Sequence, residues 1–142
     1  MNIHYSDVPT GYEHCLSQHC PKAETCLHRI AALCAADAGV ETFTIYNPAT
    51  LNEEGCCKHY RCSSPILVKR GMSTFFDAMP HKASIGLRRT LEVHYGHTQF
   101  HRIRHGELDI TPQMQAYIQR QMTELGIETP PAYDEEAERL AW

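Results

Sequence analysis

The placement of its cysteines constrains this chain more than any other feature of the sequence. Six of the seven cysteines fall into two clusters, over residues 15–26 and 56–62, and only Cys34 stands apart. Their number is odd, and the N-terminus lacks the basic and apolar pattern of a secretion signal, so a disulfide framework explains them poorly. We therefore expect reduced thiols that are available to bind a metal ion, in a protein of the cytoplasm.

The first cluster supplies three of the metal ligands that we expect. Its cysteines form a C-x4-C-x5-C run made of Cys15, Cys20 and Cys26. Pro21 is typical of the first position of a helix, which we expect over residues 21–37. Cys26 would then project from the second turn of that helix, near enough to its N-terminus for the helix dipole to stabilise a thiolate.

A fourth ligand from the second cluster would complete the site and tie two distant segments of the chain together. Cys57 or Cys56 is the candidate, and the aromatic and basic residues that follow Cys57 favour it. The alternatives are Cys56, Cys62 and the nearby histidines His14, His19 and His59. Four thiolates suit either a zinc ion or a 4Fe-4S cluster, and the spacing does not decide between these cofactors. In the competing interpretation the thiols bind no metal and are buried as small apolar side chains, which is what we expect of Cys34.

Hydrophobic periodicity and turn residues predict an α+β fold that is mainly helical, in one domain. Residues 1–71 form a Cys-rich, metal-tied region, whose two-stranded hairpin pairs residues 41–46 with residues 65–69. It packs on a helical unit over residues 72–126, and residues 127–142 follow as an extended acidic tail. The helices that we expect in the helical unit cover residues 74–79, 82–95, 98–105 and 112–125.

The net charge of −4 is distributed unevenly along the chain. Residues 81–120 hold six basic and three acidic side chains together with five histidines, whereas residues 121–142 hold one basic and six acidic side chains. A basic segment beside an acidic one favours an anionic partner, or a tail that folds back and competes for the same surface. An ordinary solvated helix face is the simpler interpretation of these charges.

Residues 87–106 resemble the helix-turn-helix of phage-repressor-like regulators, because a glycine separates a longer helix from a short basic one. The resemblance implies that Phe100 and Ile103 face the core while the polar side chains of the second helix face nucleic acid. Those polar side chains are Thr98, Gln99, His101, Arg102 and Arg104. The alternatives are a plain helical cap with a histidine-rich surface, and a metal site at His97 and His101.

Several short motifs are spread along the whole chain. They are the cysteine run of residues 15–26, Cys57-Lys58-His59-Tyr60-Arg61, Phe100-His101-Arg102, Gly106-Glu107, Thr111-Pro112-Gln113-Met114-Gln115 and the terminal Trp142. Together they resemble an uncharacterised bacterial family of small cysteine-containing proteins, a domain of unknown function. The resemblance implies one fold unit and a bacterial setting, and it carries no activity.

The sequence therefore predicts a small metal-binding regulator that contacts DNA or RNA through residues 98–104. Its cysteine site would stabilise the fold if it binds zinc, or sense redox state if it holds an iron–sulfur cluster. The alternative is a protein-interaction or structural module in which the metal only stabilises the fold. We expect no membrane partner, because no apolar run approaches the roughly 20 residues that a membrane span needs. We expect no catalysis either, because nothing places a third, orienting group beside a cysteine–histidine pair.

Overall fold

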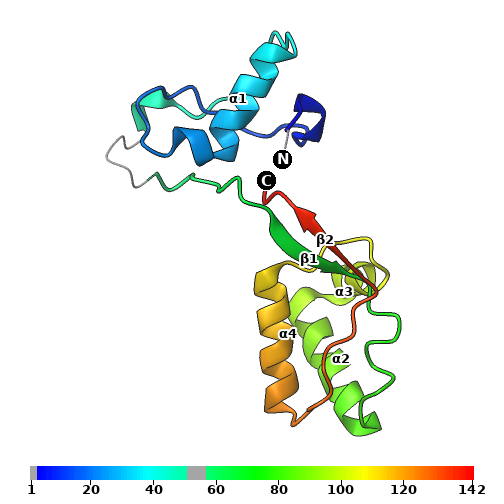
Figure 1. The fold of residues 1–142 in the computed structure, drawn as a ribbon. Helices are drawn as coiled ribbons and strands as arrows, with labels where there is room; N and C mark the ends of the chain where they lie inside the picture. The colour runs from blue at the N-terminus through cyan, green and yellow to red at the C-terminus, as the bar shows by residue number, and fades with distance from the viewer. Residues whose placement is uncertain (1–2, 51–56) are drawn as a thin grey trace. The chain divides into compact units, whose positions relative to one another are not determined.

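The computed structural model describes residues 3–50 and 57–142 (Figure 1). The fold is α+β and mainly helical, as the sequence predicts. The chain divides into two compact units, one made of residues 1–65 with residues 140–142, and the other of residues 66–139. The division therefore comes six residues before the end of the Cys-rich region that composition suggests at residue 71. Within the described ranges, no helix is both long enough and apolar enough to cross a membrane.

The first unit is organised around the helix α1 (Leu27–Asp37). Three 3-10 turns accompany it: η1 (Tyr5–Asp7), η2 (Ala23–Thr25) and η3 (Pro48–Thr50). The expected start of the helix at Pro21 is wrong, and so is the place of Cys26 in its second turn. Cys26 is instead the extended N-cap residue of α1, with φ −99° and ψ 120°.

Long-range backbone pairing explains the late start of α1. The Leu27 N–H donates to the carbonyl of Arg61 at 2.8 Å, and the Ser63 N–H donates to the carbonyl of Thr25 at 2.9 Å. Both hydrogen bonds require an extended backbone at Cys26, so the helix cannot begin before it.

The buried face of α1 also differs from the one that its apolar spacing predicts, which holds Cys26, Leu27, Ile30, Ala31 and Leu33. Its buried side chains are Leu27, His28, Ala31, Ala32 and Ala35. Leu33, which the apolar periodicity places in the core, is 50% exposed. Cys34 is only half-buried, and its thiol donates to the carbonyl of Ile3 at 3.3 Å. The core of this helix is thus built mainly from alanines around one buried histidine.

The expected pairing of residues 41–46 with residues 65–69 is wrong. The strand β1 (Ile66–Arg70) pairs antiparallel with β2 (Glu135–Arg139), which comes from the predicted acidic tail. The register places Lys69 opposite Glu136, and these two side chains form an ion pair. Opposite charges on facing positions stabilise such a pair of strands, and β1 is basic where β2 is acidic. From residues 41–46, only Ile45 takes part in a strand-like contact, an isolated bridge to His14.

The helices of the second unit follow the sequence closely. They are α2 (His81–Tyr95), α3 (His97–Arg104) and α4 (Pro112–Glu124), and α2 packs beside both α3 and α4 (Figure 1). The Thr111 hydroxyl accepts a hydrogen bond from the Met114 N–H at 3.3 Å, so it caps α4, and Pro112 occupies the first helical position. Gly96, at φ 81°, separates α2 from α3.

One expected helix of this unit, over residues 74–79, is replaced by turns. Its backbone N–H groups make turn-like hydrogen bonds, such as that from the Asp77 N–H to the Thr74 carbonyl at 3.1 Å, because so short a segment gains little from helix formation by itself. Its apolar side chains still join the core. The buried core of the second unit consists of Met72, Phe75, Phe76, Met79, Leu87, Leu91, Phe100, Ile103, Ile110, Ile118, Met122 and Ile127.

Gly71 ends β1 in a conformation that a larger residue cannot share. Its φ is +68°, and a Cβ at this position would overlap the carboxylate of Asp134. That carboxylate accepts hydrogen bonds from the N–H and the hydroxyl of Ser73, at 3.1 and 2.6 Å. The turn therefore needs a glycine for both its dihedral angle and its space.

Replacing Gly71 should destabilise the second unit more than the same change at a matched glycine. Gly126 has the same φ of +68°, but nothing lies within 4 Å of the place that its Cβ would occupy. Both alanine variants should lose about 1–2 kcal/mol through left-handed strain, and Gly71→Ala should lose more through its clash with Asp134. Urea denaturation of both variants measures the difference, and equal losses would show that the Asp134 contact costs nothing.

Candidate metal centre and nucleic-acid interface

The four cysteines that the sequence selects as metal ligands line one small cavity in the first unit. This thiol cavity has a volume of about 20 Å³ and is bordered by Cys15, Cys20, Cys26 and Cys57. The remaining residues along its wall are Ser17, Ala23, His28, Arg29, Tyr46, His59 and Tyr60. A space of this size holds one water-sized atom.

Backbone hydrogen bonds bring these thiols to one place. The Cys15 N–H donates to the carbonyl of His28 at 3.0 Å, which fastens the N-terminal loop to the first turn of α1. On the other side, the bond from the Leu27 N–H to the Arg61 carbonyl fastens the second cluster to the same turn. Cys26, at the N-cap of α1, lies between the two attachments.

The thiols are free, and they are not arranged as a ready metal cluster. None of the cysteines in the described ranges forms a disulfide; they are Cys15, Cys20, Cys26, Cys34, Cys57 and Cys62. In the same ranges, no three histidine, cysteine, aspartate or glutamate side chains stand together as metal ligands would. Coordination by the cavity thiols would therefore need rotation of their side chains.

Four of the five alternative fourth ligands can be placed relative to the cavity. His59 is part of its wall, and its ring stacks on Tyr46 with centroids 4.0 Å apart. Cys62 is exposed and does not line the cavity. The histidines His14 and His19 do not line it either. Cys56 lies outside the described residues.

His28 lines the thiol cavity but is already occupied by other contacts. Its Nδ1 lies 2.5 Å from the Glu13 carbonyl, so Nδ1 carries the proton and donates it. Its Nε2 is 3.4 Å from the Tyr12 hydroxyl, and the two rings stack with centroids 4.5 Å apart. Burial lowers the pKa of His28, and it raises the pKa of Tyr12. This neutral pair supports the wall of the cavity and offers no free nitrogen to a metal.

The candidate nucleic-acid residues lie on α3, and four of the five are exposed. Thr98, Gln99, His101 and Arg102 face solvent. Phe100 and Ile103 are buried, as the helix-turn-helix resemblance implies. Arg102 forms an ion pair with Glu107 at 3.1 Å, in which both side chains remain about half exposed.

The fifth candidate, Arg104, is turned toward the core. Its guanidinium lies over the ring of Phe76, 5.6 Å from the centroid, and its Nε is buried without a hydrogen-bond partner. Arg88 covers the same ring at 4.5 Å. Arg104 therefore packs against an aromatic side chain. The sequence does not predict this role, because a basic residue on a polar helix is expected to face solvent.

The alternative histidine site on α3 is not assembled as expected. His97 faces Glu92, with Nε2 and a carboxylate oxygen 3.4 Å apart. His101 lies instead beside His105, with ring centroids 4.2 Å apart. The described residues therefore hold no third ligand beside either pair.

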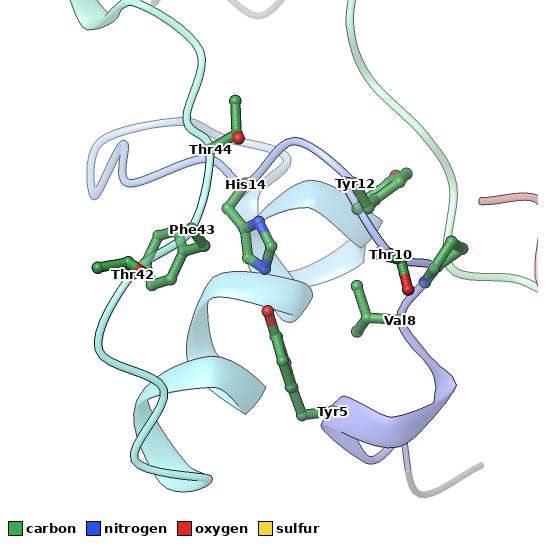
Figure 2. Close-up of a pocket in the computed structure, with 10 residues that line it drawn as sticks. Tyr5, Val8, Thr10, Tyr12, His14, Thr42, Phe43 and Thr44 are labelled. Carbon is green, nitrogen blue, oxygen red and sulfur yellow. The ribbon is translucent and has the colours of Figure 1, made fainter.

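His14, an alternative fourth ligand by sequence, lies in a different setting. Its side chain is 2% exposed, and neither ring nitrogen has a hydrogen-bond partner. It stacks on Phe43 with centroids 4.4 Å apart and borders a separate hollow, shown in Figure 2. The sequence carries no signal for this buried histidine. Whether its ring nitrogens find hydrogen-bond partners depends on which segments pack around it.

A family model spans residues 1–142 of the chain. The chain belongs to DUF6078, a family of unknown function. This membership confirms the resemblance to a family of unknown function that the short motifs indicate. Comparison with curated proteins and with solved structures gives no match. DUF6078 brings no activity with it, so the function must be argued from the sites themselves.

Cys26 and Cys62 are directly opposite each other as an isolated antiparallel bridge. The hydrogen bonds on either side make them a non-hydrogen-bonded pair, whose Cα atoms are in general about 4.5 Å apart, within the range that a disulfide spans. Hydrogen bonds from Ser64 and Tyr60 lower the pKa of the exposed Cys62 thiol, which favours the reactive thiolate.

In protein stripped of metal by a chelator, oxidation by hydrogen peroxide should join Cys26 to Cys62. The two thiols give up two electrons and two protons, and one peroxide becomes two waters. The disulfide should stabilise the first unit by roughly 2–4 kcal/mol, because it closes a long loop of the unfolded chain. Peptide mapping by mass spectrometry identifies the bond, which Cys62→Ser should abolish and Cys34→Ser should leave unchanged. A bond from Cys26 to another cysteine would contradict this register.

Proposed function

We propose that this chain is a metal-binding protein whose ligands are the four thiols of the thiol cavity. The observation that supports this most is their convergence. Three come from the first cysteine cluster and one from the second, and all four border a single space of about 20 Å³. Cys15, Cys20 and Cys57 are only partly buried, so burial as small apolar side chains accounts poorly for their place around one cavity.

The size of the cavity favours one zinc ion over an iron–sulfur cluster. A zinc ion bound by four cysteines needs only the space between sulfur atoms that lie about 2.3 Å from the metal. A 4Fe-4S cluster adds four iron and four sulfide atoms and so needs a wider space between the thiols. Rotation about the Cα–Cβ bonds is enough to turn thiols on the cavity wall inward.

The surroundings suit the charge that such a site would carry. Four thiolates around one zinc ion leave a net charge of about −2. Arg29 is part of the cavity wall, and Cys26 stands at the N-cap of α1, where the helix dipole favours negative charge. Both features place positive charge beside the anionic site that zinc coordination would create.

Protein purified without oxygen should contain about one zinc per chain and no visible absorbance. Single replacement of Cys15, Cys20, Cys26 or Cys57 by serine should lower both the zinc content and the melting temperature, because the metal ties two segments together. Elemental analysis and thermal unfolding measure the two effects.

Cys34→Ser is the matched control, because Cys34 belongs to the same unit and lies outside the cavity. It should keep its full zinc content. Wild-type protein without zinc after reconstitution, or undiminished zinc in all four variants, would refute the proposal. About four iron atoms per chain with brown colour would show that the thiols hold a 4Fe-4S cluster instead of a zinc ion.

A second candidate function is nucleic-acid binding by α3. The observation that favours it is the division of this helix, with Phe100 and Ile103 buried while Thr98, Gln99, His101 and Arg102 are exposed. Exposed polar side chains on a short helix after a glycine turn are the arrangement that helix-turn-helix proteins present to DNA. In this proposal Arg104 has a packing role only.

Arg102→Ala should weaken a salt-sensitive mobility shift with duplex DNA or RNA and reduce the salt slope of binding by about one, since one phosphate contact is lost. Arg120→Ala is the control, because Arg120 is an exposed arginine beside an acidic partner on α4 of the same unit. No shift for wild-type protein at low salt would refute nucleic-acid binding. Zinc binding without any shift would favour a structural or protein-interaction module.

A further inference from the structure

The first unit contains a second and much larger hollow, which we call the His14 pocket. Its volume is about 520 Å³, within the usual range for small-molecule sites. The residues around it are Tyr5, Val8, Pro9, Thr10, Gly11, Tyr12, His14, Thr42, Phe43 and Thr44. No cysteine in the described ranges belongs to it, so its lining differs from that of the thiol cavity.

The imidazole of His14 is held at this pocket by its backbone rather than by its ring. The His14 N–H donates to the Thr44 carbonyl at 2.8 Å, and the His14 carbonyl accepts from the Tyr46 N–H at 3.1 Å. Figure 2 shows the ring between Phe43 and Tyr5, with the hydroxyl end of Tyr5 pointing toward it.

The two ring nitrogens are the unusual feature of the pocket. Both are buried, and neither has a hydrogen-bond partner in the protein. A buried polar group without a partner is destabilising, so native proteins rarely keep one unless a ligand or water completes it. In its neutral form an imidazole offers one donor and one acceptor, which sets what a ligand must present.

The walls of the pocket select for a flat molecule. His14 stacks on Phe43 at an interplanar angle of 28°, and the rings of Tyr5 and Tyr12 lie 5.8 and 6.4 Å from it. The Tyr12 hydroxyl already contacts His28, so this tyrosine offers its ring. Aromatic faces of this kind bind planar rings by stacking.

The polar groups of the pocket select against charge. Its described lining residues include three threonines and two tyrosines but no aspartate, glutamate, lysine or arginine. An anion or cation would lose its hydration there without an opposite charge to replace it. From the unpartnered imidazole, the aromatic walls and the uncharged lining, we propose that the His14 pocket binds an uncharged planar heteroaromatic molecule, of the nucleobase or nucleoside class.

The four common ribonucleosides are the probes for this proposal, with benzoate as a planar anion for comparison. Isothermal titration should show saturable binding of at least one nucleoside and none of benzoate. The imidazole nitrogen resonances of His14, followed by NMR in wild-type protein, should shift on binding. Saturable binding of benzoate but of no nucleoside, or no saturable nucleoside binding at millimolar concentration, would overturn the proposal.

His14→Phe keeps an aromatic ring and removes both nitrogens. It should weaken nucleoside binding by at least about tenfold, since two hydrogen bonds are lost. It should also raise the melting temperature, because the unpartnered polar atoms are gone. His19→Phe is the control, since His19 is exposed in the same unit and lies outside the pocket.

Tyr5→Phe gives an independent test if the His14 variant does not fold. It removes the hydroxyl that points toward the imidazole and leaves the aromatic wall in place. Weaker nucleoside binding by Tyr5→Phe would support the proposal. Unchanged binding by both His14→Phe and Tyr5→Phe would place the nucleoside elsewhere and overturn it.

Discussion

Backbone hydrogen bonds between the start of α1 and the second cysteine cluster underlie the arrangement of the first unit. The Leu27 N–H donates to Arg61 and the Ser63 N–H to Thr25, which joins segments far apart in the chain. This pairing keeps Cys26 extended, sets where the helix begins, and brings Cys57 to the cavity that the first cluster borders. Because main-chain bonds do this work, the thiols need no bonds to one another and remain available for chemistry.

The thiol cavity and the His14 pocket lie among the described residues of this same unit and differ in chemistry. The thiol cavity is small and lined by sulfur beside one arginine, which suits a single cation held by thiolates. The His14 pocket is larger, aromatic and without charged side chains, which suits a flat neutral ring. Tyr12 lines the pocket and His28 lines the cavity, and their rings stack on each other at 4.5 Å. This stacked pair is therefore a wall that both hollows share, and burial keeps it uncharged.

In the second unit, charge decides which segments meet. The acidic residues near the C-terminus do not stay free as a tail but form β2, whose Glu136 faces Lys69 of β1. Arg139 at the end of β2 lies 3.9 Å from Asp109, which also pairs with Arg70. These contacts use basic side chains of β1 and leave the exposed face of α3 uncovered within this unit. The polar surface that the sequence indicated for nucleic acid is thus presented without competition from β2.

The sequence by itself determined the features that depend on local signals. Thr111 and Pro112 start α4, Gly96 separates α2 from α3, and the spacing of Phe100 and Ile103 buries one side of α3, because caps, glycine dihedrals and helical periodicity act within a few residues. The first cysteine cluster likewise indicated Cys15, Cys20 and Cys26, which border one cavity together with Cys57, one of several candidates for the fourth ligand. Only the tertiary structure decided the partner of β1, the start of α1, the inward turn of Arg104 and the isolation of His14. Each of these depends on which distant segment supplies a hydrogen bond, an opposite charge or an aromatic ring, and on which polar groups lose their hydration. No local sequence pattern specifies which distant segment that is.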